Sequence, residues 1–265
     1  MRRSRRRGVY LLPSLLTIGN LLCGVYAIVA VYNNDYTRSA AAILVALILD
    51  GLDGAVARLT NSQSDFGVQL DSLADLVSFG VAPAILSYAW AIKPFSQIGW
   101  LFGSIIPTAL FVSSGAFRLA RFNVQTRNLD KRYFVGLPIP AAAAVIASFV
   151  LFIRESPSLV AFHHELLSHR LTSALVVVTV YALSFLMVSR LRYRSLKGIE
   201  IKKRQPFTLL IGLTLVVLVI ASEPSLVVFS FFFCYALSGI VRSIPLVKRR
   251  VPEPVAPPAS GEGNT

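Results

Sequence analysis

Charge and cysteine are both scarce in this chain, and each shortage excludes a class of protein. Only 15% of the 265 residues are charged, whereas soluble domains carry about 25%. The two cysteines, Cys23 and Cys234, each lie within an apolar stretch, so no disulfide framework or thiolate metal site is indicated. Hydrophobic residues make up 55% of the chain and give a mean hydropathy of +0.65. Such a composition predicts a protein that crosses a membrane several times rather than a soluble domain.

Acidic residues are also few, because 13 acids stand against 26 lysines and arginines and leave a net charge of +13. An excess of this kind can mark a protein that binds nucleic acid. Here the basic residues fall between the apolar stretches, which is the pattern that the positive-inside rule describes for membrane proteins. We therefore predict no nucleic-acid partner.

Eight stretches are apolar enough to form membrane-spanning helices, which need about 20 residues to cross about 30 Å of hydrocarbon. The first stretch is longer than the core of a signal peptide, so we predict that it is a retained helix. The expected fold is an all-α membrane protein, a polytopic helical bundle of about eight transmembrane helices. The predicted spans are 11–32, 39–60, 70–92, 98–121, 138–153, 171–189, 207–222 and 225–243.

The distribution of lysine and arginine predicts the orientation of this bundle. With the N-terminus in the cytoplasm, 22 of the 26 basic residues lie on the cytoplasmic side of the membrane. Both termini and the connection between the second and third spans are then cytoplasmic. We divide the chain into a basic cytoplasmic N-terminus at 1–10, a transmembrane domain at 11–243 and a cytoplasmic tail at 244–265, which is basic at first and then disordered.

Four aspartates lie beside apolar sequence, where a charge near the bilayer centre costs roughly 2.5–3.5 kcal/mol. Asp50 and Asp53 are three residues apart near the end of the second span, and Asp71 and Asp75 are four apart at the start of the third. Both spacings place a pair on one helical face. Carboxylates that meet at one point repel one another unless cations compensate them. We predict one or two divalent ions here, and an all-oxygen ligand set favours Mg²⁺ or Mn²⁺ over zinc.

Small residues accompany these acids, since Gly51, Gly54 and Ala57 recur every three positions on the second span. A strip of this kind often serves helix–helix packing in membranes. It also allows a ligand to approach the backbone, and the adjacent Arg58 suits a phosphate group. Gly67 can relieve a tight entry into the third span. Cations, an arginine and a base beside a phosphate are what phosphoryl transfer requires.

The segment 50–75 resembles the signature of the CDP-alcohol phosphatidyltransferases. Members of that family are integral membrane enzymes, which move a phosphatidyl or similar group from a CDP-linked lipid to an alcohol and release CMP. The predicted spans are compatible with the six-helix core of the family followed by two further C-terminal helices. All eight fixed positions of the signature match, and they are Asp50, Asp53, Gly54, Ala57, Arg58, Gly67, Asp71 and Asp75.

The resemblance assigns a role to each of these positions. It implies that Asp50, Asp53 and Asp71 hold two divalent ions, Mg²⁺ or Mn²⁺. It implies that Asp75 approaches the second ion and acts as the general base. The cytidine diphosphate would meet a further set of residues, namely Gly54, Ala57, Arg58 and Gly67.

Four further segments resemble the serine branch of this family and indicate the acceptor alcohol. They are 11–23, 75–84, 115–124 and 134–143. Asn20, in the first of them, is polar within an apolar stretch. We assign it to the nucleotide pocket, although a helix–helix hydrogen bond would explain it as well.

Arg118, Arg121 and Asn123 are the candidate residues for binding serine. The two arginines lie three positions apart at the cytoplasmic end of the fourth span. Alone, they would be interpreted as arginines that extend to the membrane surface. With the serine resemblance, a carboxylate on the acceptor becomes the expected partner, because arginine can bind it through two parallel hydrogen bonds. An inositol phosphate or glycerol phosphate acceptor would also attract arginine, so charge does not separate these alcohols.

The resulting hypothesis is transfer of the phosphatidyl group from CDP-diacylglycerol to L-serine, which gives phosphatidylserine and CMP. The protein would lie among the lipids of the cytoplasmic membrane with its active site on the cytoplasmic side, and the family implies a homodimer. The same chemistry with glycerol phosphate, inositol or inositol phosphate as acceptor is one alternative. A cation transporter is another, because acids within membranes often mark ion pathways. A non-catalytic scaffold would bind neither metal nor nucleotide.

Two other polar clusters have simpler explanations. His163, His164 and His169 lie with Glu165 on an outer loop, and a solvated loop explains them better than a metal site. The seven basic residues between 190 and 204 contact anionic lipid headgroups or serve only to fix the topology.

Overall fold

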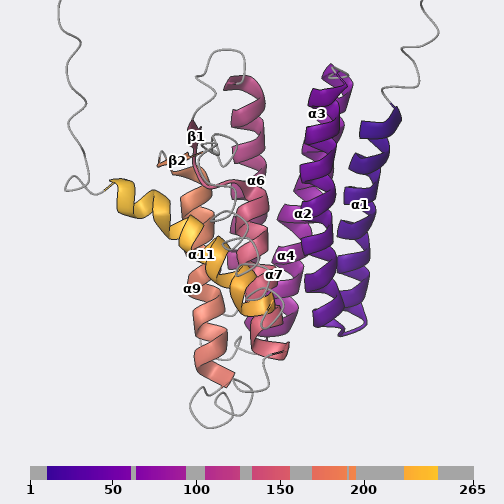
Figure 1. Ribbon diagram of the computed structural model, residues 1–265. Coiled ribbons are helices and arrows are strands. Elements are labelled where there is room, and N and C mark those ends of the chain that lie inside the picture. The colour runs from indigo at the N-terminus through magenta and orange to yellow at the C-terminus, as the bar shows by residue number, and fades with distance from the viewer. Residues whose placement is uncertain are drawn as a thin grey trace, which may run out of the picture.

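The computed structural model is a helical bundle in which most helices run along one common direction (Figure 1). It describes residues 11–60, 64–93, 105–125, 133–155, 169–189, 191–194 and 224–243. Helices α1, α2 and α3 lie together on one side of the view, and α6, α9 and the oblique α11 lie on the other (Figure 1). Their bounds are α1 Leu11–Tyr32, α2 Tyr36–Leu59, α3 Asp65–Asp75, α6 Ile106–Gln125, α7 Ile139–Glu155, α9 His169–Val188 and α11 Pro224–Ser243.

The third long helix is continuous from Asp65 to Ile92 and contains two stretches of wider π-helical turns. Ser64 caps its start, because the Ser64 side chain accepts a hydrogen bond from the backbone N–H of Gly67 at 3.0 Å. Such π turns often occur at functional sites, and the first of them begins directly after Asp75. The four segments are α3, η1 (Leu76–Val81), α4 (Ala82–Ser87) and η2 (Tyr88–Ile92).

Seven of the eight predicted spans overlap helices of the described part, whereas the stretch 207–222 and residues 98–104 of the fourth span lie outside it. Two of the described helices, α7 and α11, are apolar but short. The protein is therefore a helical membrane protein, whereas the count of eight spans stays a prediction. Among the described residues, four helices are long and apolar enough to cross a membrane, namely Pro13–Tyr32, Tyr36–Leu59, Asp65–Ile92 and Leu171–Val188.

Several sequence predictions fall on residues that are not described. These are the basic N-terminus at 1–10, the tail at 244–265, the outer-loop residues His163, His164 and Glu165, and most of the basic segment 190–204. His169 is the first residue of α9.

The all-α prediction missed a short antiparallel pair of strands, β1 (Tyr133–Val135) and β2 (Arg192–Arg194). Gly136 follows β1 with a φ of +83°, a conformation that L side chains rarely adopt. Its backbone N–H donates to the carbonyl of Leu191 at 2.8 Å, and a Cβ there would collide with the carbonyl oxygen of Met187. The pair thus ties the chain that enters α7 to the end of α9.

Helix α1 approaches the third helix closely at the level of Gly24. A Cβ on Gly24 would come within 2.7 Å of the Cα of Ser78, which belongs to η1. The Ser78 hydroxyl donates to the backbone carbonyl of Asn20 at 2.9 Å, so a buried hydrogen bond joins the two helices one turn away. Because this approach brings Asn20 beside the acidic end of the third helix, it also shapes the site described below.

Replacing Gly24 with alanine is expected to lower the free energy of unfolding by about 1–3 kcal/mol, because the added methyl group overpacks the contact with Ser78. Gly51→Ala is the matched control, since no described atom lies within 4 Å of the position of its Cβ. Thermal unfolding of both purified variants in detergent measures the difference. Equal midpoints for the two variants would contradict the close approach.

Candidate active site

A pocket of about 430 Å³ opens toward the end of the bundle where α2 stops and α3 starts. Its volume lies within the range of sites that bind small molecules. Five helices and the chain that enters α7 supply its walls. The lining residues are Leu47, Asp50, Gly51, Val68, Asp71, Ser72, Asp75, Arg118, Leu119, Phe122, Asn123, Pro138, Ile139, Pro140, Ala141, Phe232 and Tyr235.

Three of the four predicted metal ligands meet in this pocket. Asp50, Asp71 and Asp75 each offer a carboxylate oxygen, and these oxygens lie within 4.8 Å of one another. If all three are ionised, each pair repels by at least about 3 kcal/mol at an effective dielectric constant near 20. A hard divalent cation removes this repulsion and takes oxygen ligands of this kind. The three carboxylates therefore fit a divalent metal ion.

Asp53, the fourth predicted ligand, does not belong to this cluster. It is buried, with 6% of its surface exposed, and its carboxylate accepts a hydrogen bond from the hydroxyl of Thr17 on α1. A metal-binding role for Asp53 stays a prediction.

Asp75 has a specific partner on α1. The side-chain amide of Asn20 donates to a carboxylate oxygen of Asp75 at 3.2 Å, and both residues are buried. The other atom of that amide, Asn20 Oδ1, has no hydrogen-bond partner among the described residues. Asn20 is not one of the lining residues of the pocket. Its observed contact is the helix–helix hydrogen bond that the sequence allowed as an alternative to nucleotide binding.

The other predicted nucleotide residues lie away from the lining of this pocket. A Cβ on Gly54 would lie 3.3 Å from the guanidinium of Arg58, so this arginine covers the small-residue strip one turn earlier on α2. Ala57 lies between Gly54 and Arg58 on α2, and Gly67 lies in the first turn of α3. These four residues stay predicted contacts of the cytidine diphosphate.

The three predicted serine-binding residues have different surroundings. Arg118 and Asn123 line the pocket. Arg118 is close enough to Asp75 to interact with it electrostatically, and its Nε atom is buried without a hydrogen-bond partner among the described residues. Arg121 donates instead to the backbone carbonyl of Val188 at 3.4 Å and does not line the pocket.

Asn123 connects two walls of the pocket. Its side-chain amide donates to the hydroxyl of Ser72 on α3 at 3.0 Å. Ser72 lies one position after Asp71, so the bond holds α6 against the segment of α3 that carries the acids. Asn123 therefore both lines the pocket and helps to hold α6 against α3.

The comparison with known sequences decides the family. The sequence model of the CDP-alcohol phosphatidyltransferases matches residues 10–188. This chain belongs to the CDP-alcohol phosphatidyltransferase family. The matched segment contains the acid cluster and every element of the pocket except α11.

Relatives of this transferase extend the match beyond the signature. A CDP-diacylglycerol–serine O-phosphatidyltransferase of Helicobacter pylori is 37% identical over 239 residues, which cover 90% of this chain and 93% of the relative. A protein of the same name in Bacillus subtilis is 32% identical over 70% of this chain and 91% of its own length. An archaetidylserine synthase of Methanothermobacter thermautotrophicus is 38% identical over 71% of each chain.

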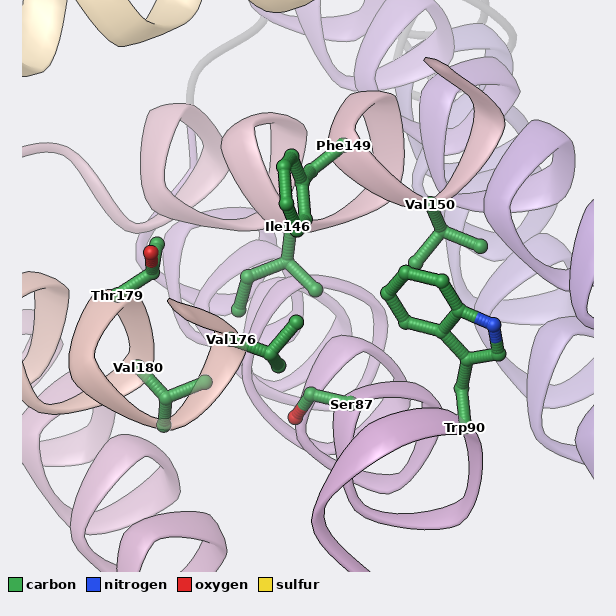
Figure 2. A pocket seen from close by; sticks show the side chains of 8 residues that line it. All are labelled: Ser87, Trp90, Ile146, Phe149, Val150, Val176, Thr179 and Val180. Atoms are coloured by element: carbon green, nitrogen blue, oxygen red, sulfur yellow. The ribbon is translucent and has the colours of Figure 1, made fainter. Parts of the chain in front are cut away.

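A second cavity in the transferase lies near the opposite end of the third helix, between α4, η2, α7 and α9 (Figure 2). Its volume is about 10 Å³, which is room for at most one water molecule. The side chains around it include Trp90, Phe149 and Ile146, and the hydroxyls of Ser87 and Thr179 donate to carbonyls of their own helices. This cavity is too small for a substrate.

Sequence reasoning missed several residues of the larger pocket. Pro138 and Pro140 lie in segment 134–143, which resembles the serine branch, but the resemblance assigns no role to either proline. Thr17, which lies in segment 11–23, does not line the pocket, but its hydrogen bond to Asp53 was also not predicted. The sequence did not indicate that Phe232 and Tyr235 line the pocket, because the sequence of α11 has the pattern of a uniformly apolar span.

Proposed function

We propose that this transferase moves the phosphatidyl group of CDP-diacylglycerol to the hydroxyl of L-serine and forms phosphatidylserine and CMP. The observation that carries the proposal is the joint presence of three carboxylates and the partly buried Arg118 in one pocket of about 430 Å³. The names of the relatives support serine as the acceptor, because the bacterial and the archaeal proteins are both named for serine products or substrates.

The acid cluster is the proposed metal site. Asp50, Asp71 and Asp75 would hold divalent cations, two Mg²⁺ or Mn²⁺ ions, with Asp53 as a further predicted ligand. When bound, these ions neutralise the diphosphate and the charge that develops on the leaving CMP. Gly54, Ala57, Arg58 and Gly67 remain the proposed contacts of the cytidine diphosphate.

Asp75 is the proposed general base. Its carboxylate accepts the proton of the serine hydroxyl, and the hydroxyl oxygen forms a bond to the phosphorus on the lipid side. The bond from that phosphorus to the oxygen of CMP breaks, and CMP leaves with the electron pair. The hydrogen bond from Asn20 fixes the orientation of the Asp75 carboxylate. Proton transfer to such a base is typically worth about 10²–10⁴-fold, and metal neutralisation together with alignment of the two substrates should contribute more.

Arg118 is the proposed partner of the serine carboxylate. It faces the same pocket as Asp75, so a small amino acid can reach both side chains at once. Asn123 shapes the wall beside it. Arg121 was also predicted to bind serine, but it does not line the pocket, so the proposal places the contact with the carboxylate on Arg118. The lipid tails of the donor would enter from the bilayer, and serine would enter from the cytoplasm.

The cellular setting follows from the distribution of charge. We propose that the protein lies in the cytoplasmic membrane, with both termini and the pocket on the cytoplasmic side. The proposal that it is a homodimer rests on the family alone. The domain 11–243 would carry the activity, flanked by the basic segment 1–10 and the tail 244–265.

The purified protein, supplied with CDP-diacylglycerol and Mg²⁺ or Mn²⁺, is expected to release CMP when L-serine is added. Glycerol phosphate, inositol and inositol phosphate should give only background release, and chelation by EDTA should abolish the reaction with serine. Chromatography of labelled CMP and of the lipid product measures both outcomes. A higher rate with one of the other alcohols would contradict serine as the acceptor. Uptake of metal into liposomes without CMP release would favour a cation transporter.

A further inference from the structure

Helix α11 lies outside the segment that matches the family, yet it contributes to the catalytic pocket. Phe232 and Tyr235 line that pocket together with Asp75 and Arg118. The two aromatic residues are three positions apart, so they lie on one face of α11. The helix therefore presents a defined aromatic surface to the site.

Aromatic packing fixes the position of α11 against α7. The ring of Phe229 lies 5.3 Å from that of Phe149 and 5.6 Å from that of Phe152, both on α7. Phe233 stacks on Phe229 at 5.4 Å within α11. Since α7 begins with the prolines that line the pocket, this cluster places Tyr235 relative to a wall of the site. Such contacts contribute about 0.5–1.5 kcal/mol each beyond the area that they bury.

Tyr235 and Arg118 together form a region of the pocket that suits an anion. The two side chains are close enough to interact electrostatically, and Tyr235 is partly buried. The guanidinium brings several N–H donors and the phenol brings one O–H donor. Hydrogen bonds from such donors to a carboxylate are roughly twice as strong as those between neutral groups.

The remaining polar groups of the pocket limit where a carboxylate can bind. Asp50, Asp71 and Asp75 occupy the α2 and α3 walls, where the proposed cations would hold the diphosphate of the donor, so this part of the pocket is not open to the carboxylate of the acceptor. An acceptor that carries both a hydroxyl and a carboxylate must therefore direct its hydroxyl toward Asp75 and its carboxylate toward α6 and α11.

We infer that α11 forms one wall of the acceptor site, where Tyr235 and Arg118 together bind the carboxylate of the acceptor and Phe232 limits its size. The inference rests on the proposed function, because it assumes an acceptor that carries a carboxylate. It assigns to a helix beyond the family segment a role in recognising the acceptor.

Steady-state kinetics of the Tyr235→Phe variant test whether the hydroxyl of Tyr235 binds the carboxylate of the acceptor. The variant loses one hydrogen bond to the carboxylate, so the KM for serine should rise about tenfold or more. Both kcat and the KM for CDP-diacylglycerol should stay within about threefold of the wild type. Tyr26→Phe is the matched control, because Tyr26 lies on α1, is 51% exposed and does not line the pocket. It should leave all three constants unchanged.

The Phe232→Ala variant tests whether the ring of Phe232 limits the size of the acceptor, independently of the hydroxyl of Tyr235. Removing the ring should raise kcat/KM for L-homoserine, which has one more methylene group than serine, by about tenfold relative to serine. Phe231→Ala is the control on the neighbouring residue, which is 52% exposed and does not line the pocket. This control should leave the ratio unchanged.

The outcomes separate this inference from the proposed function. If the wild type releases CMP with serine but Tyr235→Phe and Phe232→Ala behave like their controls, α11 has no role in acceptor binding and the proposed function stands. A rise in the KM for CDP-diacylglycerol alone would place Tyr235 on the donor side and also overturn the inference. A wild type that does not use serine would overturn both.

Discussion

The Asp75→Asn variant is expected to release CMP at least about 1,000-fold more slowly than the wild type, through a lower kcat. The change removes the proposed base and one of the three clustered carboxylates. It should not disturb the packing, because the amide oxygen of asparagine can still accept the hydrogen bond that Asn20 donates to Asp75. The loss of rate therefore reports chemistry rather than unfolding.

Asp65→Asn is the matched control for this experiment. Asp65 lies in the first turn of the same helix, is exposed and does not line the pocket, so its replacement should leave kcat within about twofold of the wild type. Binding of CDP measured by calorimetry separates the two roles of Asp75. Near-normal turnover of Asp75→Asn would contradict the assignment of Asp75 as the general base. An equal loss of CDP binding and of turnover would mean that Asp75 contributes mainly by binding the ions.

The acid cluster could be largely predicted from spacing, because residues three or four apart share a helical face. The exception is Asp53, and helix geometry explains it. At 3.6 residues per turn, a residue three positions after Asp50 is rotated by about 60° from it. On α2 this rotation directs Asp53 toward Thr17 on α1, so that its carboxylate lies outside the group of three oxygens that Asp50, Asp71 and Asp75 bring together. A sequence contains no information on which neighbouring helix lies on that side.

The apolar helices of the described residues were predictable because hydropathy and length are local properties of the chain, whereas the count of eight spans stays a prediction. The pair of strands and the role of α11 were not predictable, since both depend on contacts between distant segments. Tyr133 pairs with Arg194, which follows α7 and α9 in the chain, and the positive φ of Gly136 allows a close approach to the end of α9. Tyr235 reaches the pocket only because α11 packs on α7. No residue near any of these positions shows a pattern that would predict its distant partner.

Arg118 and Arg121 were equivalent candidates in the sequence, and the structure separates them. Arg118 faces the pocket, whereas Arg121 contacts the backbone at the end of α9. The Arg118→Ala variant is therefore expected to lose about 100-fold in kcat/KM for serine, because a charge-assisted contact with the carboxylate disappears. Arg118→Lys should recover part of this loss, since lysine keeps the charge but not the planar pair of donors.

Arg121→Ala is the matched control for this second experiment, with the same change of charge three residues away. Its kcat/KM for serine should stay within about threefold of the wild type, because the lost contact with the carbonyl of Val188 is exposed. Titration of serine and of CDP-diacylglycerol in separate series measures which substrate each arginine serves. Equal losses of kcat/KM for serine in Arg118→Ala and Arg121→Ala would contradict the different roles that we assign to the two arginines. A loss confined to CDP-diacylglycerol would place Arg118 on the diphosphate, and the carboxylate of serine would then need another partner in the pocket.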